Sequence, residues 1–232
     1  MVLMPLFAMI VGFALAVVIL NHYAAAPARR THELIWGISF ALFGVGALAE
    51  VVGDAIGWND VLARLYYVSG ASLAVALLGL GEAVLLWHGR PAQIAIAIGI
   101  VFSVISLAAV LLAPADTAVL ASDAPWRAVA AKGSLPTILA GVSNSIGTLL
   151  IVGGALYSAW VFWSKGIQRQ RMIGCVLLAA GTIVVATGGV LAGWLGQHAW
   201  LYPPMAVGVA IMFVGYLQTT RVSAPQPAVQ PS

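Results

Sequence analysis

Four side chains inside or beside long apolar runs are the residues of this sequence best suited to chemistry: Glu50, Arg64, Glu82 and Asn144. Charged and amide groups are costly in lipid, and they commonly line an ion or solute route or bond a neighbouring helix. Glu82 stands out because it alone interrupts the apolar run LLGLGEAVLLW. The four residues are therefore candidates for a ligand or solute pathway, with a structural role as the alternative for each.

Glu50 and Arg64 flank the short polar segment DAIGWND and are expected at similar depth, near the outer surface, on antiparallel neighbouring helices. They can form an ion pair there, either as a structural tether or as a point where solute or ions enter. Glu82 follows Arg64 by eighteen residues, or five helical turns, so both side chains are expected on one helix face about 27 Å apart. The residues between them on that face are uncharged, which argues against a proton relay along this helix.

Glu82 lies about 7 Å from the inner boundary marked by Trp87, so it is expected away from the bilayer midplane. Three states of its carboxyl group fit this position: contact with water, a bond to Asn21 or His22 at the end of the first apolar run, or a protonated group, because burial disfavours the charged form. Asn144 is expected near mid-bilayer on a polar helix face. An amide there usually bonds a neighbouring helix, and contact with a solute in a cavity is the alternative.

The amino-acid composition indicates whether the segments that carry these residues lie in lipid or in water. Of 232 residues, 62% are hydrophobic and 7% are charged, whereas a soluble domain has about 25% charged residues. The formal charge of +3 is spread over loops, which is not typical of a nucleic-acid-binding protein, and the single Cys175 excludes an internal disulfide. We therefore expect an integral membrane protein that contacts the lipid bilayer and has no nucleic-acid partner.

Seven apolar runs have the length of about 20 residues that a membrane-spanning helix needs. They cover residues 3–20, 34–53, 61–87, 92–113, 135–163, 172–195 and 200–219. Aromatic residues typical of interfacial belts fall near their ends: Trp36, Trp87, Trp160, Trp163, Trp194, Trp200 and Tyr202. Continuous apolar runs predict helices rather than barrel strands. The expected fold class is all-α, a polytopic bundle of seven transmembrane helices, with residues 1–222 as one domain and 223–232 as a disordered cytoplasmic tail.

Lysine and arginine are distributed unevenly between the two sides of these predicted helices. With the N-terminus outside, seven would be cytoplasmic and three external: Arg29, Arg30, Arg90, Lys165, Arg169, Arg171 and Arg221 against Arg64, Arg127 and Lys132. This bias predicts an external N-terminus and a cytoplasmic C-terminus in a bacterial inner membrane. Because no basic residue precedes the first run, we expect a retained helix rather than a signal peptide. Helices one to three and five to seven share a faint pattern, which suggests a parallel 3+1+3 repeat.

Glycines recur at a spacing of seven residues, most clearly at Gly174, Gly181 and Gly188. Seven residues is nearly two turns, so these glycines lie along one helix face. Small residues let helix backbones approach closely in lipid, where van der Waals packing drives association. We expect this face to pack within the bundle, or alternatively to bind another membrane protein or a second copy of the chain.

Known catalytic and cofactor motifs are absent from the sequence. It contains no HExxH, GxSxG, Walker or Rossmann motif, and no lysine within a predicted span that might form a retinal Schiff base. The histidines all lie at helix ends, which argues against haem within the membrane: His22, His32, His88 and His198. A cytoplasmic metal cluster of the first three stays open, although loop histidines are more often solvated. We expect no enzymatic activity, no cofactor and no metal site.

The segments RLYYVSGASLAVALLGLG, NSIGTLLIVGGALYSAWVFW and RMIGCVLLAAGTIVVATGG resemble uncharacterised bacterial seven-helix membrane proteins. More distantly, they are similar to the seven-transmembrane input regions of histidine kinases. The resemblance implies a sensory module. Because only a short tail follows the last predicted helix, it also implies that output passes through a separate partner.

Two functions fit these patterns. The first is a non-enzymatic inner-membrane protein that binds a partner protein or a lipophilic ligand, as a sensory module or as an accessory subunit. The second is a small-solute transporter with two three-helix repeats, whose route is lined by the four polar residues. A transporter of this kind needs a polar cavity at the midplane, whereas a packed module needs none.

Overall fold

The computed structural model describes residues 3–27, 30–122, 124–195 and 198–220, apart from the side chains at positions 193, 194 and 198. The long elements are α1 (Leu3–Ala25), α2 (Thr31–Ile56), α3 (Asp60–Tyr66), a π-helix (Tyr67–Ala74), α4 (Val75–Leu86), α5 (Arg90–Leu112), α6 (Leu135–Ser164), α7 (Arg169–Leu195) and α8 (Tyr202–Thr220). Short 3₁₀-helices occur at Thr117–Val119, Pro125–Ala128 and His198–Leu201. The described residues form helices, turns and loops and contain no strand.

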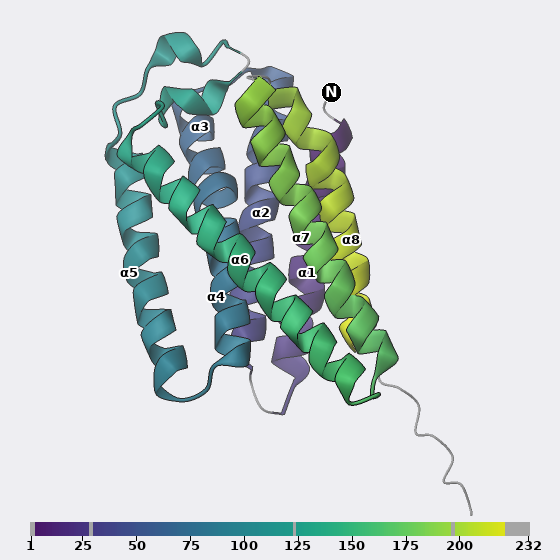
Figure 1. Ribbon diagram of the computed structural model, residues 1–232. Coiled ribbons are helices and arrows are strands. Elements are labelled where there is room, and N and C mark those ends of the chain that lie inside the picture. The colour runs from purple at the N-terminus through teal and green to yellow at the C-terminus, as the bar shows by residue number, and fades with distance from the viewer. Residues whose placement is uncertain (1–2, 28–29, 123, 196–197, 221–232) are drawn as a thin grey trace, which may run out of the picture.

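Within the described residues, seven helices are long and apolar enough to cross a membrane. One of them consists of α3, the π-helix and α4, which form a continuous span (Figure 1). This confirms the expected all-α class and the seven long apolar helices. The end of the bundle at which α1 begins is called the outer end below, and the opposite end is called the inner end. The expected tail, residues 223–232, lies outside the described residues.

Turn-forming residues set several helix boundaries. Gly57 adopts a φ of 97° directly after α2, a conformation that residues with a Cβ rarely adopt. Two residues later, the Asn59 side chain accepts a hydrogen bond from the Leu62 N–H at 2.9 Å and caps α3. Pro91 lies in the first turn of α5, where its missing N–H costs no helical bond. These local signals explain the short connections on either side of the third span.

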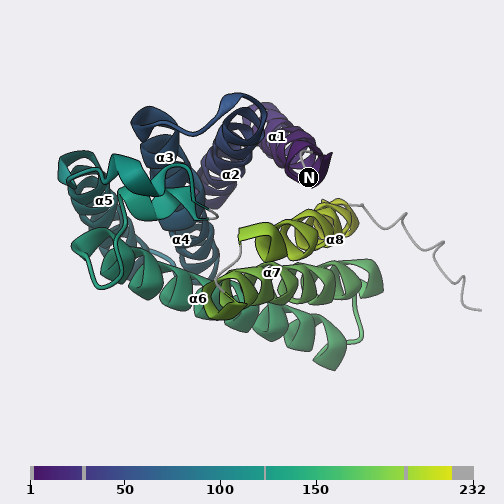
Figure 2. The same ribbon diagram turned by 90° about the horizontal axis from the view of Figure 1, so that it is seen from above.

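Six of the seven spans form a closed ring in which each helix packs on the next. The order around the ring is α1, α2, α4, α6, α7 and α8, and α8 contacts α1. Helix α5 lies outside the ring, against α4, the π-helix and α6 (Figure 2). Because α5 returns the chain to the outer end without entering the ring, the neighbours α4 and α6 run in the same direction. The neighbours α8 and α1 do so as well.

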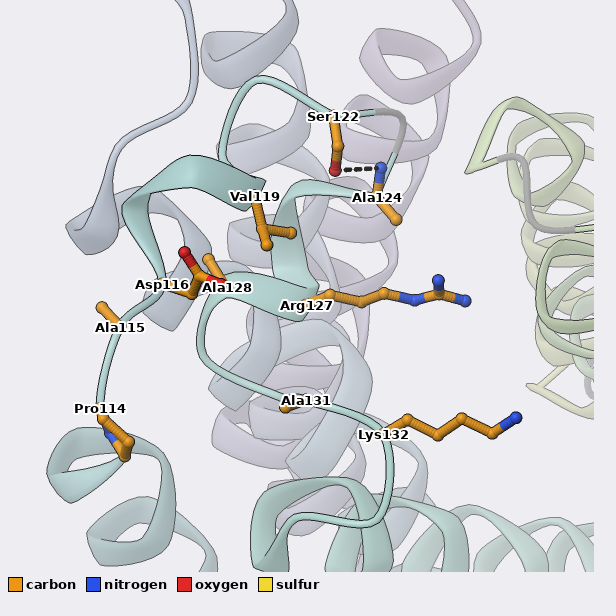
Figure 3. Close-up of a pocket in the computed structure, with 10 residues that line it drawn as sticks. All are labelled: Pro114, Ala115, Asp116, Val119, Ser122, Ala124, Arg127, Ala128, Ala131 and Lys132. Carbon is orange, nitrogen blue, oxygen red and sulfur yellow. Dashed lines mark hydrogen bonds between the residues drawn. The ribbon is translucent and has the colours of Figure 1, made fainter.

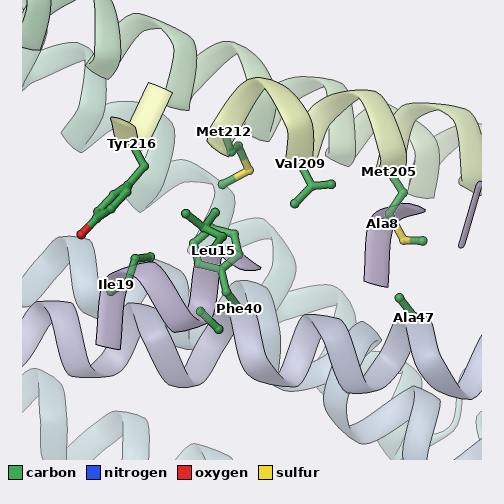
Figure 4. Close-up of a cluster of buried hydrophobic side chains, with 10 residues drawn as sticks. Ala8, Leu15, Ile19, Phe40, Ala47, Met205, Val209, Met212 and Tyr216 are labelled. Carbon is green, nitrogen blue, oxygen red and sulfur yellow. The ribbon is translucent and has the colours of Figure 1, made fainter. Parts of the chain in front are cut away.

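The interface of α1, α2 and α8 is filled by apolar side chains. This buried cluster consists of Ala8, Leu15, Ala16, Ile19, Phe40, Ala47, Met205, Val209, Met212 and Tyr216 (Figure 4). A second buried cluster lies nearer the outer end and includes Tyr67 of the π-helix, Val110 of α5 and Ala140 of α6. The two clusters show that the ring is held together by side-chain packing across helices that are distant in sequence.

The π-helix in the third span was not predicted from the sequence. Its carbonyl groups accept hydrogen bonds from neighbouring helices: Ser39 Oγ to Ala74 O at 2.5 Å, Asn144 Nδ2 to Ala71 O at 2.9 Å and Ser143 Oγ to Ser72 O at 3.2 Å. A π-helix has more residues per turn than an α-helix and often marks a functional site. Here side chains from α2 and α6 bond the carbonyl groups of the segment, which joins those two helices to the third span.

Candidate functional site

Three glutamates are buried within the bundle: Glu33 and Glu50 on α2, and Glu82 on α4. Their relative exposures are 3%, 0% and 7%. Carboxyl groups at such positions are costly unless they are bonded or serve a function. They are therefore the starting points for locating a site.

Glu50 lies near the outer end of α2, among aromatic residues. The Tyr66 hydroxyl shares a hydrogen bond with Glu50, and Tyr202 of α8 interacts with it electrostatically. The Tyr202 hydroxyl also donates a hydrogen bond to Asp54 Oδ2 at 3.0 Å, and Trp58 Nε1 donates to Asp54 Oδ1 at 3.4 Å. The cluster connects α2 to the third span and to α8, so Glu50 belongs to a polar contact between helices.

Arg64 does not form the expected ion pair with Glu50. Its guanidinium group bonds Asp60, with Nε 2.9 Å from Oδ1, and it donates to three carbonyl groups at the end of α5, those of Val110, Leu111 and Ala113. The last carbonyl groups of a helix lack intrahelical donors and carry partial negative charge, so a cation is favourable there. Arg64 therefore anchors α5 to the third span.

The expectation that Arg64 and Glu82 share one helix face is also wrong. Arg64 faces α5, whereas Glu82 lies against Gly154 of α6. The prediction assumed an uninterrupted α-helix between the two residues. The eight-residue π-helix Tyr67–Ala74 lies between them and changes the rotation per residue, so the five-turn spacing no longer holds.

Glu82 lies where α4 and α6 meet, and of the alternatives for its carboxyl group the bond to Asn21 or His22 is not found among the described residues. Its carboxyl group is adjacent to the backbone of Gly154, and it is near enough to Cys175 of α7 to interact electrostatically. No hydrogen bond to Glu82 is found within the described part of the chain. Among the three buried glutamates, Glu82 thus has the least polar surroundings.

Asn144 lies on α6 and bonds the π-helix. Its Nδ2 donates to the Ala71 carbonyl group at 2.9 Å, while Oδ1 is buried and has no hydrogen-bond partner among the described residues. The neighbouring Ser143 bonds the same π-helix. Asn144 therefore makes an interhelical hydrogen bond. Among the four candidate residues named from the sequence, no two bond each other.

The glycine face of α7 packs against α8. A Cβ at Gly174 would be 2.7 Å from Gly215 O, and a Cβ at Gly181 would be 2.7 Å from Gly208 O. Gly188 lies near Leu201 and Pro204: its Cβ would be 3.2 Å from Leu201 O and 3.1 Å from Pro204 Cβ. The three glycines are therefore occupied by an intramolecular contact and do not offer an open face to a partner helix.

Glu33 was not singled out from the sequence, because it lies directly before the predicted apolar run 34–53. It lies in the first turn of α2, where His22 Nδ1 is 3.1 Å and Arg30 Nη1 3.4 Å from its Oε1. A signal was present, since Glu33 precedes Gly37, Phe40, Gly44 and Ala47 at the three- and four-residue spacing of one buried helix face.

Trp36 and His22 also have partners that the sequence did not predict. Trp36 was expected in an interfacial belt, but its Nε1 donates to the Leu78 carbonyl group at 3.2 Å and its ring packs on Gly81, so it lies between α2 and α4. His22 bonds Glu33, and over the described residues no three His, Cys, Asp or Glu side chains approach closely enough to hold a metal ion.

A surface pocket of about 740 Å³ lies in the loop between α5 and α6. Asp116, Ser122, Arg127 and Lys132 contribute its polar side chains, and the two cations extend away from the loop (Figure 3). All four of these residues are exposed. The pocket therefore has the character of a solvated loop surface, with no buried polar group directed into it.

No family model, curated protein or solved structure matches this chain. No residue role is therefore transferred from a relative.

Proposed function

We propose that this protein is a non-enzymatic, multi-pass module of a bacterial inner membrane that binds a partner membrane protein through α5, as a sensory module or an accessory subunit. The observation that carries the proposal is the position of α5 outside the ring. Ser106 and Val110 are its only buried residues. The remaining surface exposes large apolar side chains: Ile94, Ile98, Ile100, Val101, Val104, Ile105, Leu107, Leu111 and Leu112.

The spaced glycines of α2 and α7 pack against other helices of the bundle, which supports α5 as the surface that binds a partner. Gly174 and Gly181 contact α8, and Gly37 and Gly44 contact Leu20 and Phe13 of α1. These four glycines therefore offer no open face to a partner helix. Helix α5, in contrast, is held mainly along one side and by the Arg64 anchor at its end, so most of its circumference is available to lipid, to a lipophilic ligand or to another helix.

Native purification in mild detergent tests the proposal. The expected result is a reproducible co-purifying membrane protein whose yield falls at least tenfold in an Ile98→Trp variant, because the larger ring disrupts packing on α5. Ile183→Trp is the matched control, since Ile183 is an exposed isoleucine on α7. A chain that is always solitary, or equal loss in both variants, would contradict partner binding through α5.

The orientation is part of the proposal and is supported by the charges at the two ends. The inner end carries Arg30, Arg90, Lys165, Arg169 and Arg171, whereas Arg64, Arg127 and Lys132 belong to the outer end. Arg29 and Arg221 lie outside the described residues. An excess of basic residues favours the cytoplasmic side, which supports an external N-terminus.

A small-solute transporter is the second candidate, and the buried carboxyl group of Glu82 is the observation that favours it. Against it, the centre of the α1, α2 and α8 interface is apolar, and Arg64 and Asn144 are engaged in contacts between elements. Flux through reconstituted vesicles tests the candidate with Glu82→Gln and Asn144→Ala. Unchanged flux in both variants would remove these residues from any pathway.

A further inference from the structure

The inner end of the α1, α2 and α8 interface contains two buried oxygen atoms that lack a hydrogen-bond partner among the described residues: Glu33 Oε2 and the Tyr216 hydroxyl oxygen. Both residues are more than nine-tenths buried, with exposures of 3% and 5%. A buried polar atom without a partner is unfavourable, and native proteins commonly satisfy such atoms with ordered water.

Glu33 and Tyr216 both lie near the end of α1. Tyr216 belongs to the buried cluster that contains Ile19, and its hydroxyl points away from Met212 and Val209 (Figure 4). His22, three residues after Ile19 and so on nearly the same helix face, bonds Glu33. Tyr216 also interacts electrostatically with Glu33. The carboxylate and the hydroxyl therefore face one region between the three helices.

Charge and enclosure restrict what this region can hold. The other carboxylate oxygen, Oε1, is already contacted by His22 and Arg30, so the negative charge of Glu33 has basic groups beside it. A further cation is therefore disfavoured. The burial of Glu33 and Tyr216 excludes a group as large as a lipid headgroup from contact with these two atoms. The guest must be small, neutral and able to donate a hydrogen bond to a carboxylate.

We infer that a bound water molecule bridges Glu33 Oε2 and the Tyr216 hydroxyl. Water can donate to the carboxylate and can donate to, or accept from, the hydroxyl, and two polar partners suffice for a buried water. The bridge joins α8 to the α1–α2 corner, at the inner end of the contact that closes the ring. It also extends the polar contacts of His22 and Arg30 to the edge of the apolar cluster.

Radiolytic footprinting of the full chain in lipid vesicles tests this site, because hydroxyl radicals formed from a bound water modify the adjacent side chain. The expected result is clear oxidation of Tyr216 and none of Phe40, which is equally buried, at 6%, in the apolar part of the same cluster. Oxidation of Tyr216 no higher than that of Phe40 would overturn the inference. A direct bond between Glu33 and Tyr216, with no water between them, would give that result.

Thermal unfolding in detergent provides a second measurement. If water bridges the two groups, Tyr216→Phe lowers the midpoint by a few degrees, and combining it with Glu33→Gln lowers it no further than Glu33→Gln alone. Tyr157→Phe, at an exposed tyrosine on α6, is the control and leaves the midpoint unchanged. A midpoint that rises in Tyr216→Phe would show that the hydroxyl is unsatisfied and would contradict the bridge.

Discussion

The side chain of Glu82 on α4 lies directly against the backbone of Gly154 on α6, in the space that a side chain at position 154 would occupy. On the same pair of parallel helices, the Cβ of a residue at position 79 would be 2.6 Å from Gly147 Cα. The absence of side chains at these glycines lets the helices approach closely and leaves room for the carboxyl group. The burial of Glu82 therefore depends on a residue that follows it by more than seventy positions in the sequence.

Gly154→Ala is expected to displace the Glu82 side chain and to lower the free energy of unfolding by about 2 kcal/mol, as overpacking does in well-packed interiors. Gly153→Ala is the matched control, because a Cβ at Gly153 has no atom within 4 Å. Chemical unfolding in mixed micelles measures both. An equal effect of the two substitutions would show that Glu82 and Gly154 are not in close contact.

Gly181→Ala is expected to separate α7 from α8 and to destabilise the protein by about 3 kcal/mol, because the new Cβ meets backbone atoms that cannot rotate away. Gly189→Ala on the same helix has open space and should be neutral or stabilising by up to about 1 kcal/mol, through better helix propensity. The unfolding midpoints of the two variants check the prediction. A Gly181→Ala variant as stable as the wild type would contradict it.

Arg64→Met is expected to release the C-terminal end of α5 from the third span and to cost about 2 kcal/mol, the order of magnitude of hydrogen bonds to a charged group. Arg64→Lys should recover only part of this loss, since lysine keeps the charge but lacks the planar fork of donors. Limited proteolysis of the segment between α5 and α6 reports the change as faster cleavage. Arg127→Met, at an exposed arginine of the same segment, serves as the control.

Asn144→Ala is expected to reduce stability only slightly, by about 0.6 kcal/mol, the average for an interhelical hydrogen bond measured in a membrane protein. Hydrogen exchange should rise at the π-helix amides, because the bond from Asn144 to Ala71 O is lost. Ser145→Ala provides a comparison, since Ser145 bonds its own helix at Gly141 O. Exchange that rises equally in both variants would argue against a specific role of Asn144 at the π-helix.

Single cysteines in a Cys175→Ser background test the proposed orientation. Ser122→Cys in the loop between α5 and α6 should react with an impermeant maleimide in intact cells. His88→Cys, in the turn between α4 and α5, should react only after permeabilisation; both positions are exposed. The reverse labelling pattern would place the N-terminus in the cytoplasm and would require the proposed orientation to be inverted.

The seven apolar helices were predicted from local hydropathy, whereas contacts that depend on a second helix were not. The π-helix Tyr67–Ala74 illustrates the difference, because side chains of α2 and α6 bond its carbonyl groups and its altered turn separates the faces of Arg64 and Glu82. Glu33 did carry a local signal, its spacing with Gly37 and Phe40, but its contact with His22 of α1 is evident only from the packing of the two helices.

The seven apolar helices and the all-α class were determined by the sequence alone, because the transfer of a helix into lipid depends on its own length and composition. The closed ring, the outer position of α5 and the partner of each buried polar group were decided only by the tertiary structure. Their positions depend on which helices meet and on how each is rotated about its axis. Hydropathy carries little information on either, since many arrangements of seven apolar helices have the same pattern.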